Sequence, residues 1–155
     1  MIEGLKGKRG FTLIELLIVA GLIAVILLPI SMFFTANLGH FYRENDRISA
    51  QSEAGRLMEL ITARAMESTD YKPEHGTHQF TAGDGKWVFK HEDTKLYYNT
   101  DRKKADEMTE LSSNVTGFEI KAKYWGPNTV GVDITLEVTY DEEKCGLKNT
   151  VYFRN

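Results

Sequence analysis

Apolar and polar positions divide this chain into three stretches. From residue 11 to residue 34, 19 of 24 residues are apolar and the only charge is Glu15. A helix over this run would be about 36 Å long, enough to cross a hydrocarbon core of about 30 Å. We therefore predict a membrane-spanning helix over residues 11–34.

The second stretch continues the helical period but is amphipathic. Charged residues separate its apolar positions, and a polar cluster that ends in Pro73 marks its end. We predict one long helix over residues 11–71, whose outer part packs one face on the C-terminal domain and leaves the mixed charges in solvent. The predicted face consists of Leu38, Phe41, Ile48, Ala54, Leu57, Met58, Ile61 and Ala65.

The third stretch is predicted to be a sheet domain over residues 72–155. From residue 77 onward its period changes to two, which is typical of half-buried strands. The clearest strand covers residues 130–140, and the turn at residues 126–128 joins it to a strand over 118–124. The predicted fold class is α+β, a long N-terminal helix packed on a C-terminal antiparallel sheet. Further predictions are a strand over residues 145–153, a hairpin of residues 86–90 and 95–99, and a short helix around residues 105–111.

Charge gives the chain an orientation and argues against nucleic acid as a partner. The net charge is −3, whereas Lys6, Lys8 and Arg9 make the first ten residues positive. Positive residues favour the cytoplasmic side, so we expect a cytoplasmic N-terminus and an extracytoplasmic C-terminal domain. A secretory signal fits poorly, since its apolar region is about 7 to 15 residues long. Beyond residue 40 basic and acidic residues alternate, which does not favour binding to phosphates.

The sequence around Glu15 resembles the class III leader of type IV prepilins and type II secretion pseudopilins. The similarity lies in Lys8-Arg9-Gly10-Phe11-Thr12-Leu13-Ile14-Glu15 and the apolar run that follows. The resemblance implies that a prepilin peptidase cuts after Gly10, that the new amino group of Phe11 is methylated, and that Glu15 serves subunit assembly. It also implies a pilin-like fold, with other pilin or pseudopilin subunits and a membrane assembly platform as partners.

The physical chemistry of these positions agrees with the resemblance. A carboxylate inside the bilayer costs about 2.5 to 3.5 kcal/mol, so Glu15 needs a partner unless it reaches the headgroups. Cleavage creates an α-amino group on Phe11, and in a bundle of staggered helices this cation could meet the Glu15 of a neighbour. Our hypothesis is that this pair selects the correct register.

Pro29 lies inside the predicted spanning helix. Proline removes a backbone donor and clashes with the preceding turn, so we expect a kink or a locally melted stretch near residues 27–31. Two interpretations remain open. One is the ordinary tolerance of membrane helices for proline, and the other is flexibility that helps the subunit leave the bilayer for a filament.

Other candidate sites have weak support. His75 and His78 have a spacing that suits a metal, but no third ligand is evident, so we expect no metal and no cofactor. The single Cys145 excludes an internal disulfide and is either a small buried residue or the site of an intermolecular bridge. No nucleophile and base stand in a recognisable frame, so we expect no enzyme activity.

The predicted function is that of a structural subunit of a pilus or pseudopilus at the cell surface. A stretch at residues 49–56 is similar to minor pilins and J-type pseudopilins, which points to a minor subunit. One alternative is an uncut membrane-anchored binding domain. Another is a competence pseudopilin for DNA uptake, for which Arg102, Lys103 and Lys104 are the compact basic candidates.

Overall fold

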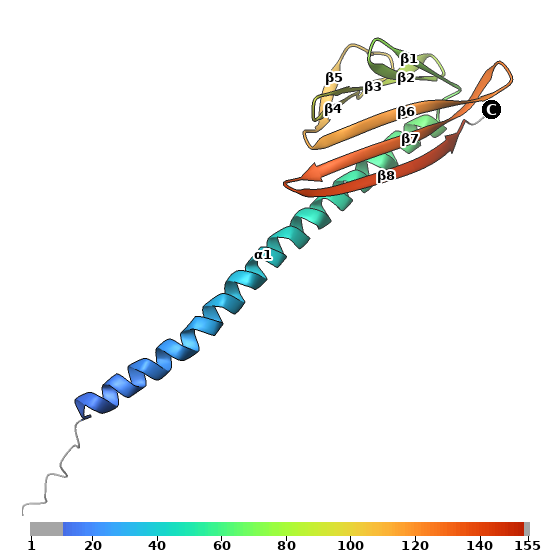
Figure 1. Cartoon of the computed structure of the whole chain (residues 1–155). Coiled ribbons are helices and arrows are strands. Elements are labelled where there is room, and N and C mark those ends of the chain that lie inside the picture. Colours follow the sequence, from blue (N-terminus) through green and yellow to red (C-terminus); the bar gives the residue numbers. More distant parts are fainter. Residues whose placement is uncertain (1–10, 154–155) are drawn as a thin grey trace, which may run out of the picture. The chain divides into compact units, whose positions relative to one another are not determined.

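The computed structural model describes residues 11–153 and shows one long helix followed by eight strands within that range (Figure 1). The chain consists of two compact units, one that ends at Tyr42 and one that begins at Arg43. Helix α1 covers Leu13–Met66. The strands are β1 (Asp70–Glu74), β2 (Thr77–Ala82), β3 (Gly85–Glu92), β4 (Lys95–Asn99), β5 (Met108–Ser112), β6 (Val115–Trp125), β7 (Asn128–Tyr140) and β8 (Glu143–Tyr152).

The helix ends at Met66, five residues before the predicted boundary. The buried hydroxyl of Ser68 donates a hydrogen bond to the carbonyl oxygen of Arg64 at 2.7 Å, and its amide donates to that of Ala65 at 3.1 Å. These bonds satisfy carbonyl groups that the end of a helix leaves without partners. Pro73 lies in β1, an edge strand, which is where sheets tolerate proline.

The strands form two antiparallel sheets, where the sequence suggested one. The first has the order β1-β2-β3-β4-β5 and the second the order β6-β7-β8. The hairpins predicted at residues 86–99 and 118–140 are confirmed, and the last predicted strand corresponds to β8. Two-residue turns close the long hairpins, with Gly126 at φ 62° before β7 and Asp141 at φ 50° after it.

The short helix predicted around residues 105–111 is wrong. Met108–Ser112 forms strand β5, which pairs antiparallel with β4. The pairing gives the backbone of β4 its second partner, and the ion pair from Lys95 Nζ to Glu110 Oε2, at 2.9 Å, bridges the two strands. Polar local composition was a poor guide because pairing across the chain outweighs local propensity.

One core joins the outer part of α1 to both sheets. The helix buries six side chains, all from Ala50 onward, against aromatic and β-branched residues of the strands. Leu38, Phe41 and Ile48 of the predicted face are instead each more than half exposed. The buried helical residues are Ala50, Ala54, Leu57, Met58, Ile61 and Ala65.

Polar contacts fix the same part of the helix to the strands. Arg56 donates from Nη2 to the carbonyl oxygen of Leu111 at 3.1 Å, and Asn149 donates from Nδ2 to Thr62 Oγ1 at 3.0 Å. The hydroxyl of Tyr140 donates to the carboxylate of Glu53. These contacts come from β5, β7 and β8, so both sheets hold the helix.

Candidate functional site

The first turn of α1 contains a reciprocal hydrogen-bonded cap built by Thr12 and Glu15. The Glu15 amide donates to Thr12 Oγ1 at 3.3 Å, and Glu15 Oε2 accepts from the Thr12 amide at 3.2 Å and from its hydroxyl at 3.1 Å. This is a capping box, in which a Thr and a Glu three residues later satisfy two free N–H groups. The buried-charge argument alone did not identify Thr12, although the Thr-x-x-Glu spacing before an apolar run is the signature of such a cap.

The cap places the carboxylate of Glu15 at the very start of the helix. There it also benefits from the positive end of the helix dipole. Phe11, 79% exposed, precedes the cap directly. Glu15 already accepts a hydrogen bond from the backbone N–H of Thr12. An amino group created on Phe11 would therefore lie one residue before that N–H. Gly10 and the basic leader lie outside the described residues.

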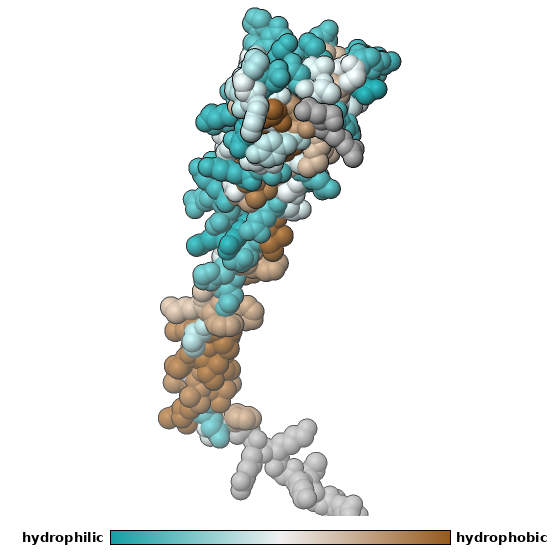
Figure 2. Space-filling view, turned by 90° about the vertical axis from the view of Figure 1, so that its right-hand side faces the viewer, coloured by the Kyte–Doolittle hydropathy of each residue, from teal (hydrophilic) through white to brown (hydrophobic). Residues whose placement is uncertain are grey.

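From Leu16 to Phe34 the exposed surface of α1 is almost entirely apolar. Every described residue up to Asn45 is exposed, and the large aliphatic and aromatic side chains are all at least 43% exposed. Figure 2 shows that apolar colour gathers on this part of the helix, whereas the surface of the C-terminal unit is mostly hydrophilic. Among residues 11–153, α1 is the helix whose length and composition suit a membrane span. Such a surface requires lipid or other apolar helices around it.

Pro29 does not interrupt α1. The helix runs from Leu13 to Met66 with the proline inside it, so the predicted local melting is wrong. The hydroxyl of Ser31 donates to the carbonyl oxygens of Leu27 and Leu28, both at 2.9 Å, which adds local bonds beside the proline. The carbonyl oxygen that lacks a backbone donor because of Pro29 is that of Val25, four residues earlier, and neither of these two bonds reaches it. A kink at Pro29 stays a prediction.

The two histidines considered for a metal do not converge on one. His75 is in the β1–β2 turn, and His78 Nδ1 lies 2.6 Å from the hydroxyl of Tyr71. That hydroxyl donates to the carbonyl oxygen of Ile120 at 3.1 Å, so its single hydrogen is used and Nδ1–H of His78 is the donor to it. No group of three metal-ligating side chains occurs within residues 11–153.

The compact basic residues are engaged with acids. Lys103 Nζ lies 2.8 Å from Asp84 Oδ2, and Arg102 Nη2 lies 3.4 Å from Asp84 Oδ1. Lys104 Nζ lies 2.9 Å from Glu107 Oε1. These pairs reduce the positive charge that this segment could offer to phosphates.

Comparison with known proteins identifies the N-terminal segment. Residues 5–31 match the prokaryotic N-terminal methylation motif. No curated protein and no solved structure matches the chain. The matched segment contains the Thr12–Glu15 cap and most of the apolar surface of α1, and the strands follow as an antiparallel C-terminal unit. The chain thus carries the class III leader of the type IV pilins and pseudopilins, at the start of an α+β architecture of pilin type.

Proposed function

We propose that this chain is a minor structural subunit of a type IV pilus or of a type II secretion-like pseudopilus. A prepilin peptidase removes residues 1–10 by cutting after Gly10, and Phe11 is then methylated. Residues 11–34 hold the subunit in the cytoplasmic membrane, with its N-terminus in the cytoplasm and residues 72–155 outside. The methylation motif at residues 5–31 supports processing and assembly with other pilins, and points to a structural protein and not an enzyme.

The capping box is the observation that carries this proposal. In the uncut chain the Glu15 carboxylate accepts two hydrogen bonds from Thr12, which lower the cost of holding it in the membrane but leave its charge without a cation. Cleavage adds a positively charged amino group on Phe11, the residue before Thr12. In a low-dielectric bundle, attraction between this amine and a carboxylate exceeds what neutral donors supply.

Assembly then follows from the surface of the helix. The apolar side chains of α1 before Tyr42 have no partner within the described chain, and lipid and neighbouring helices solvate them about equally well. The choice between membrane and filament therefore depends on polar groups. In one register the Phe11 amine of an incoming subunit pairs with the Glu15 carboxylate of a neighbour, which stabilises that register. Other registers leave the carboxylate without a cation.

Mass spectrometry of the protein from membranes and from filaments tests the proposal. We expect a chain that begins at Phe11 and carries one added methyl group. An uncut anchor for an extracytoplasmic binding domain would instead keep Met1 and would be found in the membrane fraction alone. A filament fraction that begins with Met1 would overturn the proposal.

A DNA-uptake pseudopilin shares the leader and needs a separate test. The ion pairs of Arg102, Lys103 and Lys104 weigh against a strong DNA-binding face. We expect no salt-sensitive binding of duplex DNA by the full chain in detergent. Binding that weakens steeply between low and physiological salt would favour the competence role.

A further inference from the structure

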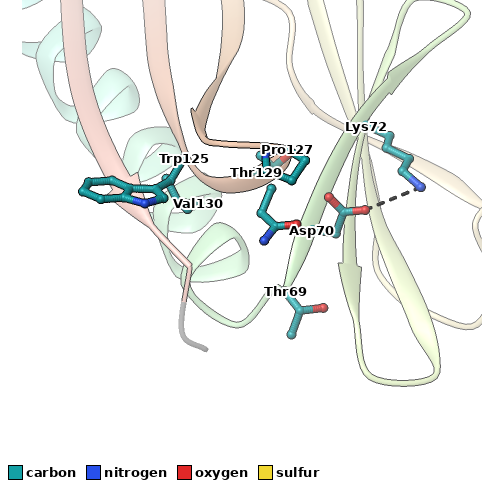
Figure 3. Close-up of a pocket in the computed structure, with 8 residues that line it drawn as sticks. Thr69, Asp70, Lys72, Trp125, Pro127, Thr129 and Val130 are labelled. Atoms are coloured by element: carbon teal, nitrogen blue, oxygen red, sulfur yellow. Dashed lines mark ion pairs between the residues drawn. The ribbon is translucent and has the colours of Figure 1, made fainter.

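The C-terminal unit contains a pocket where β1 begins and the β6–β7 hairpin ends. Its volume is about 670 Å³, within the range of small-molecule sites. Figure 3 shows Trp125 on the hairpin side, and Asp70 and Lys72 on the β1 side. Thr69, Asn128 and Thr129 add two hydroxyls and an amide to the lining. The segments that form it are more than 50 residues apart in the sequence.

Backbone bonds hold both walls in place. The Thr69 amide donates to the carbonyl oxygen of Thr81 at 2.8 Å, which ties the start of β1 to β2. On the other side, the Phe153 amide donates to the carbonyl oxygen of Val130 at 2.9 Å. The hairpin turn consists of Gly126, whose φ of 62° suits glycine, and Pro127, whose ring restricts its backbone. A pocket with fixed walls loses little entropy when a ligand binds.

The charges of the lining cancel each other. Lys72 Nζ lies 3.5 Å from Asp70 Oδ2, and both side chains project from the same face of β1. Among residues 11–153, no further charged side chain lines the pocket. A charged ligand such as a phosphate would meet the opposing charge of this pair. The lining instead offers hydrogen-bond donors and acceptors together, which suits a neutral ligand rich in hydroxyl groups.

Trp125 adds an aromatic ring to this polar lining. Its side chain is 80% exposed, whereas Trp87, the other tryptophan of the chain, is 8% exposed and lies in the core. An exposed apolar residue needs no explanation by itself. Beside a polar pocket, however, the indole supplies a flat apolar surface at little cost in side-chain entropy.

We propose that this pocket binds a neutral pyranose sugar of a glycan. A pyranose has a face of C–H groups that packs on an aromatic ring and a rim of hydroxyl groups that both donate and accept. Figure 3 shows the Trp125 indole and the Asp70 carboxylate on opposite sides of the lining. Trp125 would therefore take the C–H face of one sugar unit, while Asp70, Asn128 and the two threonines would bind hydroxyls of the neighbouring unit. A second copy of this chain would need a larger apolar area than one indole. The inference goes beyond the structural role and does not depend on cleavage at Gly10.

Tryptophan fluorescence of the full chain tests this proposal. The protein is kept in a detergent with no sugar headgroup, and cellobiose, lactose and N,N′-diacetylchitobiose are added separately. Because Trp87 is buried, a sugar-dependent change in emission reports on Trp125. We expect a saturable change with a dissociation constant of about 1 mM for at least one disaccharide. Sorbitol, which has hydroxyl groups but no ring face, should give none.

Two variants locate the binding. Asn128→Ala removes a hydrogen-bonding group of the pocket and should weaken binding at least about tenfold. Tyr152→Ala removes an aromatic residue that is 63% exposed outside the pocket, and should leave binding unchanged. Circular dichroism confirms that each variant is folded.

Three results would overturn the proposal. The first is no saturable change with any disaccharide up to about 50 mM. The second is an equal response to sorbitol, or binding that Asn128→Ala leaves intact. The third is a Trp125→Ala chain that binds the sugars as tightly as the parent does, measured by calorimetry because this variant lacks the fluorescent reporter, and yet is excluded from filaments. That result would assign the pocket to subunit contacts.

Discussion

Helix α1 is continuous from Leu13 to Met66, but its two parts depend on different surroundings. Up to Tyr42 none of its described residues is buried, although most are apolar. From Ala50 onward one face is buried among the strands, and the opposite face carries the charges. The comparison shows that backbone hydrogen bonds alone do not explain a long helix. The first part needs lipid or other helices, and the second needs the sheets.

The largest expected effect concerns the charge at the start of the first part. Glu15→Ala should still be cut and inserted but should enter filaments at least about tenfold less, because the amine of a neighbour loses its partner. Glu15→Gln keeps an acceptor for the Thr12 cap and removes only the charge. Quantitative immunoblots of sheared filaments measure both variants.

The pair of variants separates charge from capping. If charge selects the register, Glu15→Gln fails like Glu15→Ala. Normal incorporation of Glu15→Gln would show that the cap is what matters, and normal incorporation of both would remove Glu15 from assembly altogether.

One leucine from each part of α1 tests the difference in burial. Leu57 is fully buried and Leu38 is 51% exposed. Leu57→Ala should lower the free energy of unfolding of the C-terminal unit by about 2–5 kcal/mol, because it leaves a cavity. Leu38→Ala should change it by less than about 0.5 kcal/mol. Urea unfolding of the full chain in detergent, followed by the emission of Trp87, measures both, and equal losses would contradict the comparison.

Glycine-to-alanine changes sharpen the comparison further. A Cβ at Gly131 would lie 2.3 Å from the carbonyl oxygen of Val151, whereas a Cβ at Gly39 on α1 would meet nothing within 4 Å. Gly131→Ala should destabilise by about 1–3 kcal/mol, since the backbone of β8 must shift. Gly39→Ala should be neutral or raise helix stability by up to about 1 kcal/mol. Circular dichroism during thermal unfolding measures the melting temperature of each variant. It should fall for Gly131→Ala and should stay unchanged or rise for Gly39→Ala.

The smallest expected effect is a dependence of stability on pH within the C-terminal unit. Burial lowers the pKa of His78, nearby His91 lowers it further, and Glu119 opposes them. The unfolded chain, with a pKa of about 6.5, therefore binds a proton more readily. The free energy of unfolding should fall as the pH drops below about 6.5, until the pH reaches the folded-state pKa.

Urea unfolding at several pH values measures this dependence. His78→Gln should flatten it between about pH 6.5 and 5. His75→Gln is the matched control, because the His75 side chain is 93% exposed, and it should leave the slope unchanged. An unchanged slope in His78→Gln would assign the acid sensitivity to other groups.

Strong local patterns predicted most of the secondary structure. The unbroken apolar run and the amphipathic stretch after it predicted α1, and period-two alternation predicted β6, β7 and the hairpin that joins them. Pattern failed where pairing decided the outcome. β5 has too little alternation to identify it as a strand, and its strand conformation depends on β4 beside it.

The candidate site divides in the same way. Gly10, Phe11 and Glu15 are recognisable because their chemistry lies within a few consecutive residues. Thr12 could have been found from its spacing to Glu15. The sugar pocket could not, because Thr69 to Lys72 and Trp125 to Val130 become neighbours only when β1 packs near β7.

Short-range order along the chain was sufficient to establish the apolar span, the leader and the type of the strongest elements, since helix and strand periods are properties of adjacent residues. Folding decided the partition into two sheets, which residues of the helical stripe are buried, and which distant polar groups share a pocket. The physical reason is that burial and strand pairing depend on contacts between residues far apart in sequence, and no local period encodes these contacts.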